Sequence, residues 1–130
     1  MMKQKFIFLL LLITLFYCSC NSSGNNKKEL DLDPVKVSPG IFKILLENEH
    51  VRVVQYSLQP GEKDEWHTHP AKSSYVVSGG ILKVHLKTGE IIVANEKEGT
   101  ASWMEYVGEH YVENIGNTIV TIVFTEIKTK

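Results

Sequence analysis

Cysteine is almost absent from this sequence. Its 130 residues include two cysteines, Cys18 and Cys20, and both lie near the N-terminus. No disulfide can therefore form within the chain beyond residue 20, and the fold must depend on its own apolar core. A chain of this length predicts one domain, which is large enough to form such a core without cross-links or a structural metal.

An excess of charge of one sign is also lacking. The formal net charge is −1, and the body of the chain contains no run of lysine or arginine. Aromatic residues are scattered and do not alternate with basic residues, as they would in a groove that stacks nucleotide bases. We therefore expect no nucleic acid partner.

No apolar run is long enough for a comfortable membrane span. The longest, Phe6–Phe16, is interrupted by Thr14 and follows Lys3 and Lys5. A basic start, a short apolar core and small residues at its end predict a secretory signal peptide over residues 1–19. A short membrane anchor or a buried helix is the alternative interpretation of this segment.

The end of the apolar segment resembles the lipobox of bacterial lipoproteins. The small residue Ser19 directly precedes Cys20, whereas the bulky Tyr17 precedes Cys18, the alternative cysteine. The resemblance implies a diacylglyceryl thioether and an acylated amine on Cys20. Several acyl chains would anchor the protein firmly to a membrane, on its extracytoplasmic side.

The residues after the cysteines are polar and show no periodicity. We expect residues 20–34 to form a flexible tether and residues 35–130 to form the folded domain. Cleavage after residue 19 would remove two lysines and change the net charge from −1 to about −3.

Helical periodicity is missing from the rest of the chain. Short segments rich in β-branched and aromatic residues alternate with turn signals such as Pro60-Gly61 and Ser78-Gly79-Gly80. This pattern predicts an all-β sandwich or barrel. The expected strands are 42–46, 51–58, 65–69, 74–77, 81–86, 91–95, 100–103, 111–114 and 119–126.

Three of the five histidines indicate a metal site. His67 and His69 are two residues apart, so on a regular strand both side chains would point to one face. His110 belongs to a distant segment, and neutral imidazole is the commonest metal-binding side chain. Three such nitrogens could hold a metal and leave positions open for water or substrate. The alternative is a polar cavity in which the histidines only form hydrogen bonds.

These histidines and their flanking residues resemble the two motifs of the cupin family. Gly61, His67-Thr68-His69 and Gly79-Gly80 follow the first motif, and Gly99, His110 and Asn114 follow the second. The resemblance covers roughly residues 41–127. It implies a double-stranded β-helix, or jelly-roll barrel, with His67, His69 and His110 as ligands of a divalent metal ion. Iron, zinc, manganese, nickel and copper are all candidates for that ion.

Two departures from the cupin motifs affect the expected site. The glutamate of the first motif should fall near Lys72–Ser74, where no residue is acidic. In the second motif Glu105 replaces the proline, and the glycine comes one place late, at Gly108. The usual site of three histidines and one glutamate is therefore incomplete, and the three histidines remain.

The resemblance leaves three functions open. Cupins with three histidines and iron include thiol dioxygenases, which implies a metal-dependent, dioxygenase-like enzyme acting on a small polar molecule outside the cytoplasm. A non-catalytic cupin that binds a small ligand or a metal is the second possibility. A structural or interaction barrel with a vestigial pocket is the third. A homodimer formed through sheet edges is plausible in each case.

Other polar residues are expected to have simpler roles. Glu65 would lie at the rim of the site, although a fourth ligand or an acceptor for a histidine N–H are alternatives. Glu105 is expected to be a solvated carboxylate, and His50 and His85 to be surface histidines. Asn114 should form hydrogen bonds to backbone near one end of the barrel.

Overall fold

The computed structural model describes residues 30–129, so the expected signal peptide and both cysteines lie outside the described residues. The described part is all-β, as predicted, apart from the short helix α1 (Pro34–Val37). Its strands are β1 (Phe42–Glu47), β2 (Val51–Leu58), β3 (Lys72–Ser78), β4 (Gly80–Leu86), β5 (Ile91–Glu96), β6 (Ala101–Met104), β7 (His110–Asn114) and β8 (Val120–Ile127). No helix within residues 30–129 is long and apolar enough to cross a membrane.

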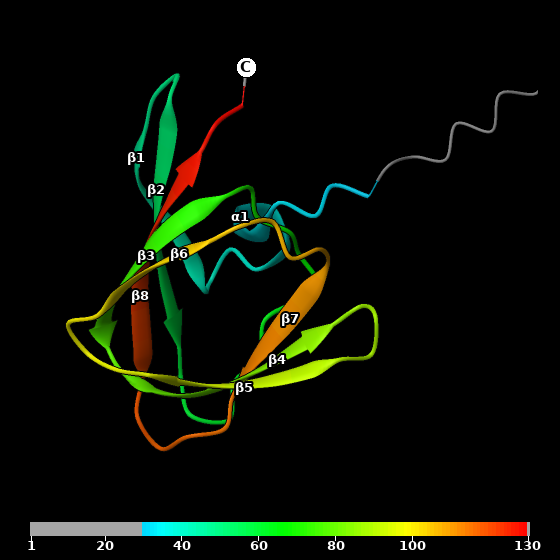
Figure 1. Cartoon of the computed structure of the whole chain (residues 1–130), viewed down its shortest axis with the longest axis vertical. Helices are drawn as coiled ribbons and strands as arrows, with labels where there is room; N and C mark the ends of the chain where they lie inside the picture. The colour runs from blue at the N-terminus through cyan, green and yellow to red at the C-terminus, as the bar shows by residue number, and fades with distance from the viewer. Residues whose placement is uncertain (1–29, 130) are drawn as a thin grey trace, which may run out of the picture.

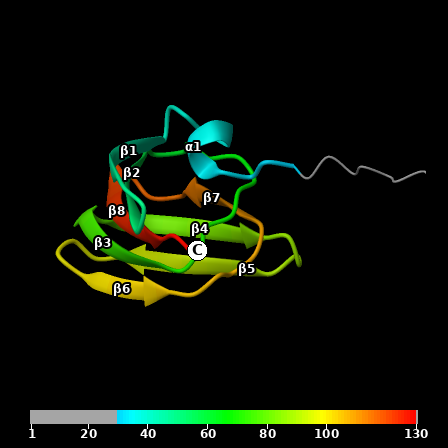
Figure 2. The same ribbon diagram turned by 90° about the horizontal axis from the view of Figure 1, so that it is seen from above.

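The strands form two antiparallel sheets with the core between them (Figure 1). The larger sheet has the order β1-β2-β8-β3-β6, and the smaller has the order β5-β4-β7. Figure 2 shows β4 and β5 side by side, with α1 on the opposite side of the molecule. Neighbours in each sheet include strands far apart in sequence, so the fold brings distant side chains together.

The core follows from strict alternation along the central strands. In β8 every second residue from Val120 to Glu126 is buried, and the intervening side chains are half-buried. Strand β2 repeats this pattern from Val54 to Leu58. Because successive side chains of a strand point to opposite faces, each strand contributes one row of side chains to the interior, and these rows are apolar except for Glu126.

Most of the predicted strands agree with the structure to within two residues at each end. The exception is the segment 65–69, which is not a strand. It forms only an isolated bridge between His67 and His110, and the N–H of Thr68 donates to the carbonyl oxygen of Leu32 at 3.0 Å. That hydrogen bond goes to the N-terminal segment instead of a sheet, and Pro70 cannot donate to a ladder.

The tether prediction needs correction at its C-terminal end, because residues 32–34 are held against the domain. Pro34 is buried, and Asp33 forms an ion pair with Arg52 at 2.8 Å. Asp33 also caps α1 by accepting a hydrogen bond from the N–H of Val35. Aspartate at the cap and proline at the first position favour a helix start, but four residues are too few to show helical periodicity in a sequence.

Candidate metal site and its cavity

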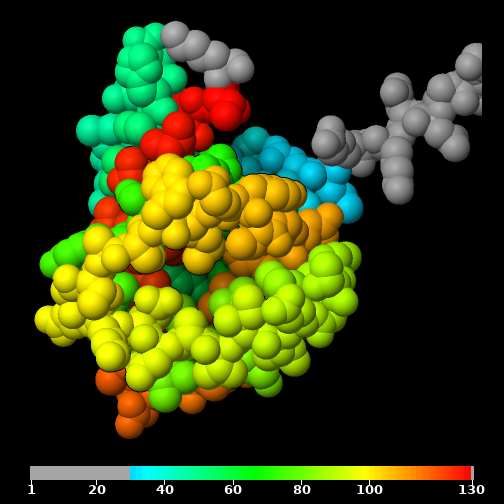
Figure 3. Space-filling view, in the orientation of Figure 1, coloured from blue at the N-terminus to red at the C-terminus, as the bar shows by residue number. Residues whose placement is uncertain are grey.

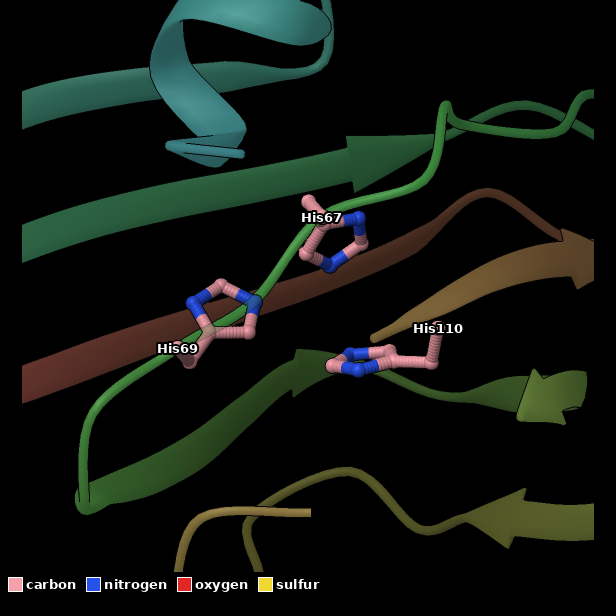
Figure 4. A group of neighbouring side chains, drawn as sticks. All are labelled: His67, His69 and His110. Atoms are coloured by element: carbon pink, nitrogen blue, oxygen red, sulfur yellow. The ribbon is translucent and has the colours of Figure 1, made fainter. Parts of the chain in front are cut away.

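Three buried histidines meet inside the barrel (Figure 4). His67 and His69 come from the segment between β2 and β3, and His110 is the first residue of β7. One potential ligand atom from each residue lies within 4.8 Å of the others. The backbones of His67 and His110 exchange two hydrogen bonds, of 2.9 and 3.0 Å, which hold the two segments together. The predicted convergence of the three side chains is confirmed.

Backbone carbonyl groups fix two of the imidazole rings. The Nδ1 atom of His67 is 2.7 Å from the carbonyl oxygen of Glu65, and that of His110 is 2.9 Å from the carbonyl oxygen of Gly108. Since a carbonyl oxygen only accepts, the neutral rings must carry their proton on Nδ1. The Nε2 atoms of both rings therefore keep a lone pair.

A carboxylate fixes the third ring. The Nδ1–H of His69 donates to the Oε1 atom of Glu126 at 2.6 Å, and the Nε of Arg52 donates to Oε2 at 2.6 Å. A second nitrogen of Arg52 binds Asp33 at 2.8 Å. This arrangement, a carboxylate that holds the outer nitrogen of a histidine, typically orients metal-binding imidazoles and raises their basicity.

The environment keeps the histidines uncharged. Burial, together with the neighbouring His69, lowers the pKa of His67 to about 3. Burial also lowers the pKa of His69 and that of His110, and the cationic Lys72 acts in the same direction on both. Near neutral pH the three rings are thus in the deprotonated state that a metal ion requires.

A cavity of about 160 Å³ adjoins the histidines, and side chains from both sheets line it. Figure 3 shows the surface hollowed where β5, β6 and the segment between β6 and β7 meet. Most of the wall is apolar, and it includes Phe42, Leu82, Ile122 and Phe124. A cavity with apolar walls and a few convergent polar groups is the usual form of a small-molecule site.

Sequence reasoning missed Lys72 as a residue of this cavity. Only 4% of its surface is exposed, and its Nζ atom lies 3.6 Å from the centroid of the Phe124 ring. Burial lowers its pKa to about 7. Lys72 and Ser74 both line the cavity, in the region where the cupin motif would place its glutamate. Its place near the missing glutamate of the motif was the one sequence signal, and nothing else about a single lysine at the start of a strand shows that it is buried.

Asp64 is the second residue that the sequence did not reveal. Its side chain is fully buried, and its two oxygens accept hydrogen bonds from the N–H of Val112 at 2.6 Å and the hydroxyl of Tyr56 at 3.2 Å. Burial raises its pKa to about 7, although both hydrogen bonds act in the opposite direction. Asp64 therefore contributes a weakly acidic carboxyl group to the cavity wall.

The side chains of the other acidic candidates stay outside the site. Glu65 is exposed, and its carbonyl oxygen, not its carboxylate, contacts His67. The carboxylate of Glu105 accepts a hydrogen bond from the indole of Trp103 at 2.6 Å on the surface, as expected for a solvated group.

Predictions for three other polar residues remain, and those for Asn114 and His50 are confirmed. Asn114 donates to the carbonyl oxygens of Leu58 and Thr118, and His50 is exposed. The prediction for His85 holds only in part: its ring lies on the face away from the cavity, as expected, but it stacks on Tyr111 with centroids 4.3 Å apart. That contact leaves 17% of the side chain exposed.

The sequence matches no model of a known protein family and no curated protein. Solved structures do match. A cupin domain from Bordetella pertussis Tohama I is 26% identical with a TM-score of 0.63, covering 68% of this chain and 93% of that one. A cupin family protein with a double-stranded β-helix fold from Methanocaldococcus jannaschii is 18% identical with a TM-score of 0.55, covering 67% and 78%.

A third solved structure has a similar fold. A protein with a double-stranded β-helix domain from Klebsiella pneumoniae is 20% identical with a TM-score of 0.53, covering 69% of this chain and 84% of that one. These likenesses agree with the two-sheet architecture. Residues 30–129 thus form a small cupin domain in which three neighbouring histidines could bind a metal ion.

Proposed function

We propose that this protein binds one divalent metal ion through the Nε2 atoms of His67, His69 and His110. One observation carries the proposal: each Nδ1 is already hydrogen-bonded, so three lone pairs remain at the point where the rings meet. Imidazole suits iron, zinc, nickel and copper, whereas manganese prefers oxygen ligands. Manganese therefore ranks below the other four candidates.

We further propose that the site supports a metal-dependent, dioxygenase-like reaction on a small molecule in the adjoining cavity. A bound divalent ion would supply Lewis acidity at the histidine end of the cavity. Three protein ligands leave positions free, and the largely apolar wall that includes Phe42 and Phe124 suits the apolar part of a small molecule. Asp64, whose carboxyl pKa is about 7, can hold or release a proton beside His67.

Elemental analysis tests the metal proposal directly. We expect protein purified without chelator or nickel resin to carry about one ion of iron, zinc, nickel or copper for each chain. Oxygen uptake with candidate small substrates then separates an enzyme from a non-catalytic binding protein. If the folded protein binds no metal even after incubation with Fe(II) or Zn(II), the proposed function is wrong.

We also propose that the protein is a lipoprotein anchored through Cys20 on the extracytoplasmic side of a membrane. Its support is the sequence pattern of the first twenty residues, which lie outside the described part of the chain. The Cys20→Ala variant is expected to move from the membrane fraction to the soluble fraction, because it lacks the acyl attachment site.

The neighbouring cysteine supplies a matched control for the anchoring experiment. The Cys18→Ala variant should remain in the membrane fraction and incorporate labelled palmitate as the natural protein does. Release of the Cys18→Ala variant alone would move the lipid to Cys18, and retention of both variants would refute lipid anchoring at either cysteine.

A further inference from the structure

A buried amine without an acidic partner stands on the wall of the cavity. Among residues 30–129, no hydrogen bond or ion pair reaches the Nζ atom of Lys72, whose one close polar interaction is with the face of the Phe124 ring. Lys72 precedes Ser74 on β3, and both side chains line the cavity. The ammonium group thus faces the space that a ligand would fill.

The acidic residues around Lys72 are already committed or remain at a distance. Glu126 is held by Arg52 and His69, and the carboxyl group of Asp64 is held by Tyr56 and a backbone N–H. Glu96 also lines the cavity, but it forms no ion pair with Lys72 within 4.0 Å. Attraction to these three carboxyl groups raises the pKa of Lys72, but it only partly offsets the lowering of that pKa by burial.

Leaving a charge buried and unpaired opposes folding, so a chain under no other constraint would replace this lysine by an apolar residue. The region where the cupin motif would place a glutamate holds Lys72 and Ser74 instead. We therefore expect the ligand, and not the protein, to supply the negatively charged group that pairs with Lys72. Nearby, the hydroxyl groups of Ser74 and Ser102 lie 2.7 Å apart and add donors to the same wall.

The cavity, which opens to the surface, also indicates the size and polarity of the part of the ligand that it would bury. Its volume is about 160 Å³. An engineered apolar cavity of about 150 Å³ in another protein accommodates benzene. Since most of the wall is apolar, the body of the ligand should be apolar as well.

We propose that Lys72 binds the anionic end of the ligand, and that this ligand is a small carboxylate with an apolar body about the size of that of benzoate. This inference rests on the proposed function in one respect, because it treats the cavity beside the histidines as the ligand site. Lys72 acts as a specificity-determining residue. Beside three neutral histidines, its ammonium group places a positive charge on the cavity wall whether or not a metal is bound.

Calorimetric titration of the full-length protein in detergent with benzoate and with benzamide, its neutral isostere, tests the assignment. At pH 6, where the amine is mostly protonated, the natural protein is expected to bind benzoate at least about tenfold more tightly than benzamide. In the Lys72→Met variant the two affinities should become equal, with the affinity for benzamide unchanged. Methionine keeps the length of the side chain and removes the buried charge, so this variant should fold.

Two controls make the result decisive. The variant Lys43→Met, which changes an exposed lysine on β1, should bind both compounds as the natural protein does. Titrations with EDTA and with added Zn(II) separate this inference from the metal proposal, since the preference for benzoate should persist without metal. Equal binding of the two compounds by the natural protein, no binding of either, or a preference that survives in Lys72→Met would each overturn the assignment.

Discussion

The His67→Ala variant should lose at least about 100-fold in affinity for a divalent metal ion while remaining folded. Changes to residues that merely orient metal ligands typically reduce metal affinity 10-fold to 100-fold, and removal of a ligand should exceed that range. The remaining two rings keep their own partners, because His69 is held by Glu126 and His110 by the carbonyl of Gly108. Two imidazoles alone would leave the ion weakly held.

Fold retention in this variant follows from how His67 is held. Its backbone exchanges hydrogen bonds with His110, and alanine can form the same pair. The side chain gives up its hydrogen bond to Glu65 and its edge contact with Phe42, and the truncation enlarges the cavity. We expect a loss of unfolding free energy of about 1–3 kcal/mol, which a stable small domain tolerates.

Metal titration with an optical competitor and circular dichroism on the same samples measure the two effects. His50→Ala is the matched control, because it removes an exposed histidine and should change neither quantity. If both the His67→Ala and the His110→Ala variants bound metal as tightly as the natural protein, the ion would have to bind elsewhere. Unfolding of both variants would instead assign the histidines a structural role.

The sequence predicts the parts of this fold that depend on local pattern. Alternation along β2 and β8 reports directly which residues face the interior, and glycine and proline mark the turns between strands. The spacing of His67 and His69 was likewise sufficient to predict that both rings enter one site. That prediction holds even though their segment is not a strand, because the backbone of His67 is bridged to that of His110.

Pairings between distant residues could not be predicted in this way. Arg52 and Glu126 are 74 positions apart and meet only because β2 pairs with β8. Alternation along β8 did carry a signal, since it places Glu126 on the same face as Phe124 and thus inside the domain. A carboxylate on a core face requires a partner, but nothing in the sequence identifies that partner as Arg52 and His69.

The Glu126→Gln variant is expected to lose about 3–5 kcal/mol of unfolding free energy, the typical result of breaking a buried charge pair by changing one partner. Glu126 is 1% exposed, and its two oxygens accept from Arg52 and His69, each at 2.6 Å. Glutamine offers one oxygen and one NH₂ group, so one of the two donors would face another donor. Urea denaturation measures the loss.

The same substitution should weaken metal binding about 10-fold to 100-fold, because the ring of His69 loses the acceptor that orients it. Glu47→Gln is the matched control, since it breaks an exposed ion pair with Lys128 and should cost less than about 1 kcal/mol. An unchanged metal affinity in a destabilised Glu126→Gln variant would limit Glu126 to holding Arg52 in the fold. A loss of both stability and metal affinity would show that one buried carboxylate joins the N-terminal segment, the sheet and the metal site.

The link between Glu126 and the N-terminal segment runs through Arg52, which also forms an ion pair with Asp33. The Asp33→Asn variant should therefore reduce the free energy of unfolding without reducing metal affinity.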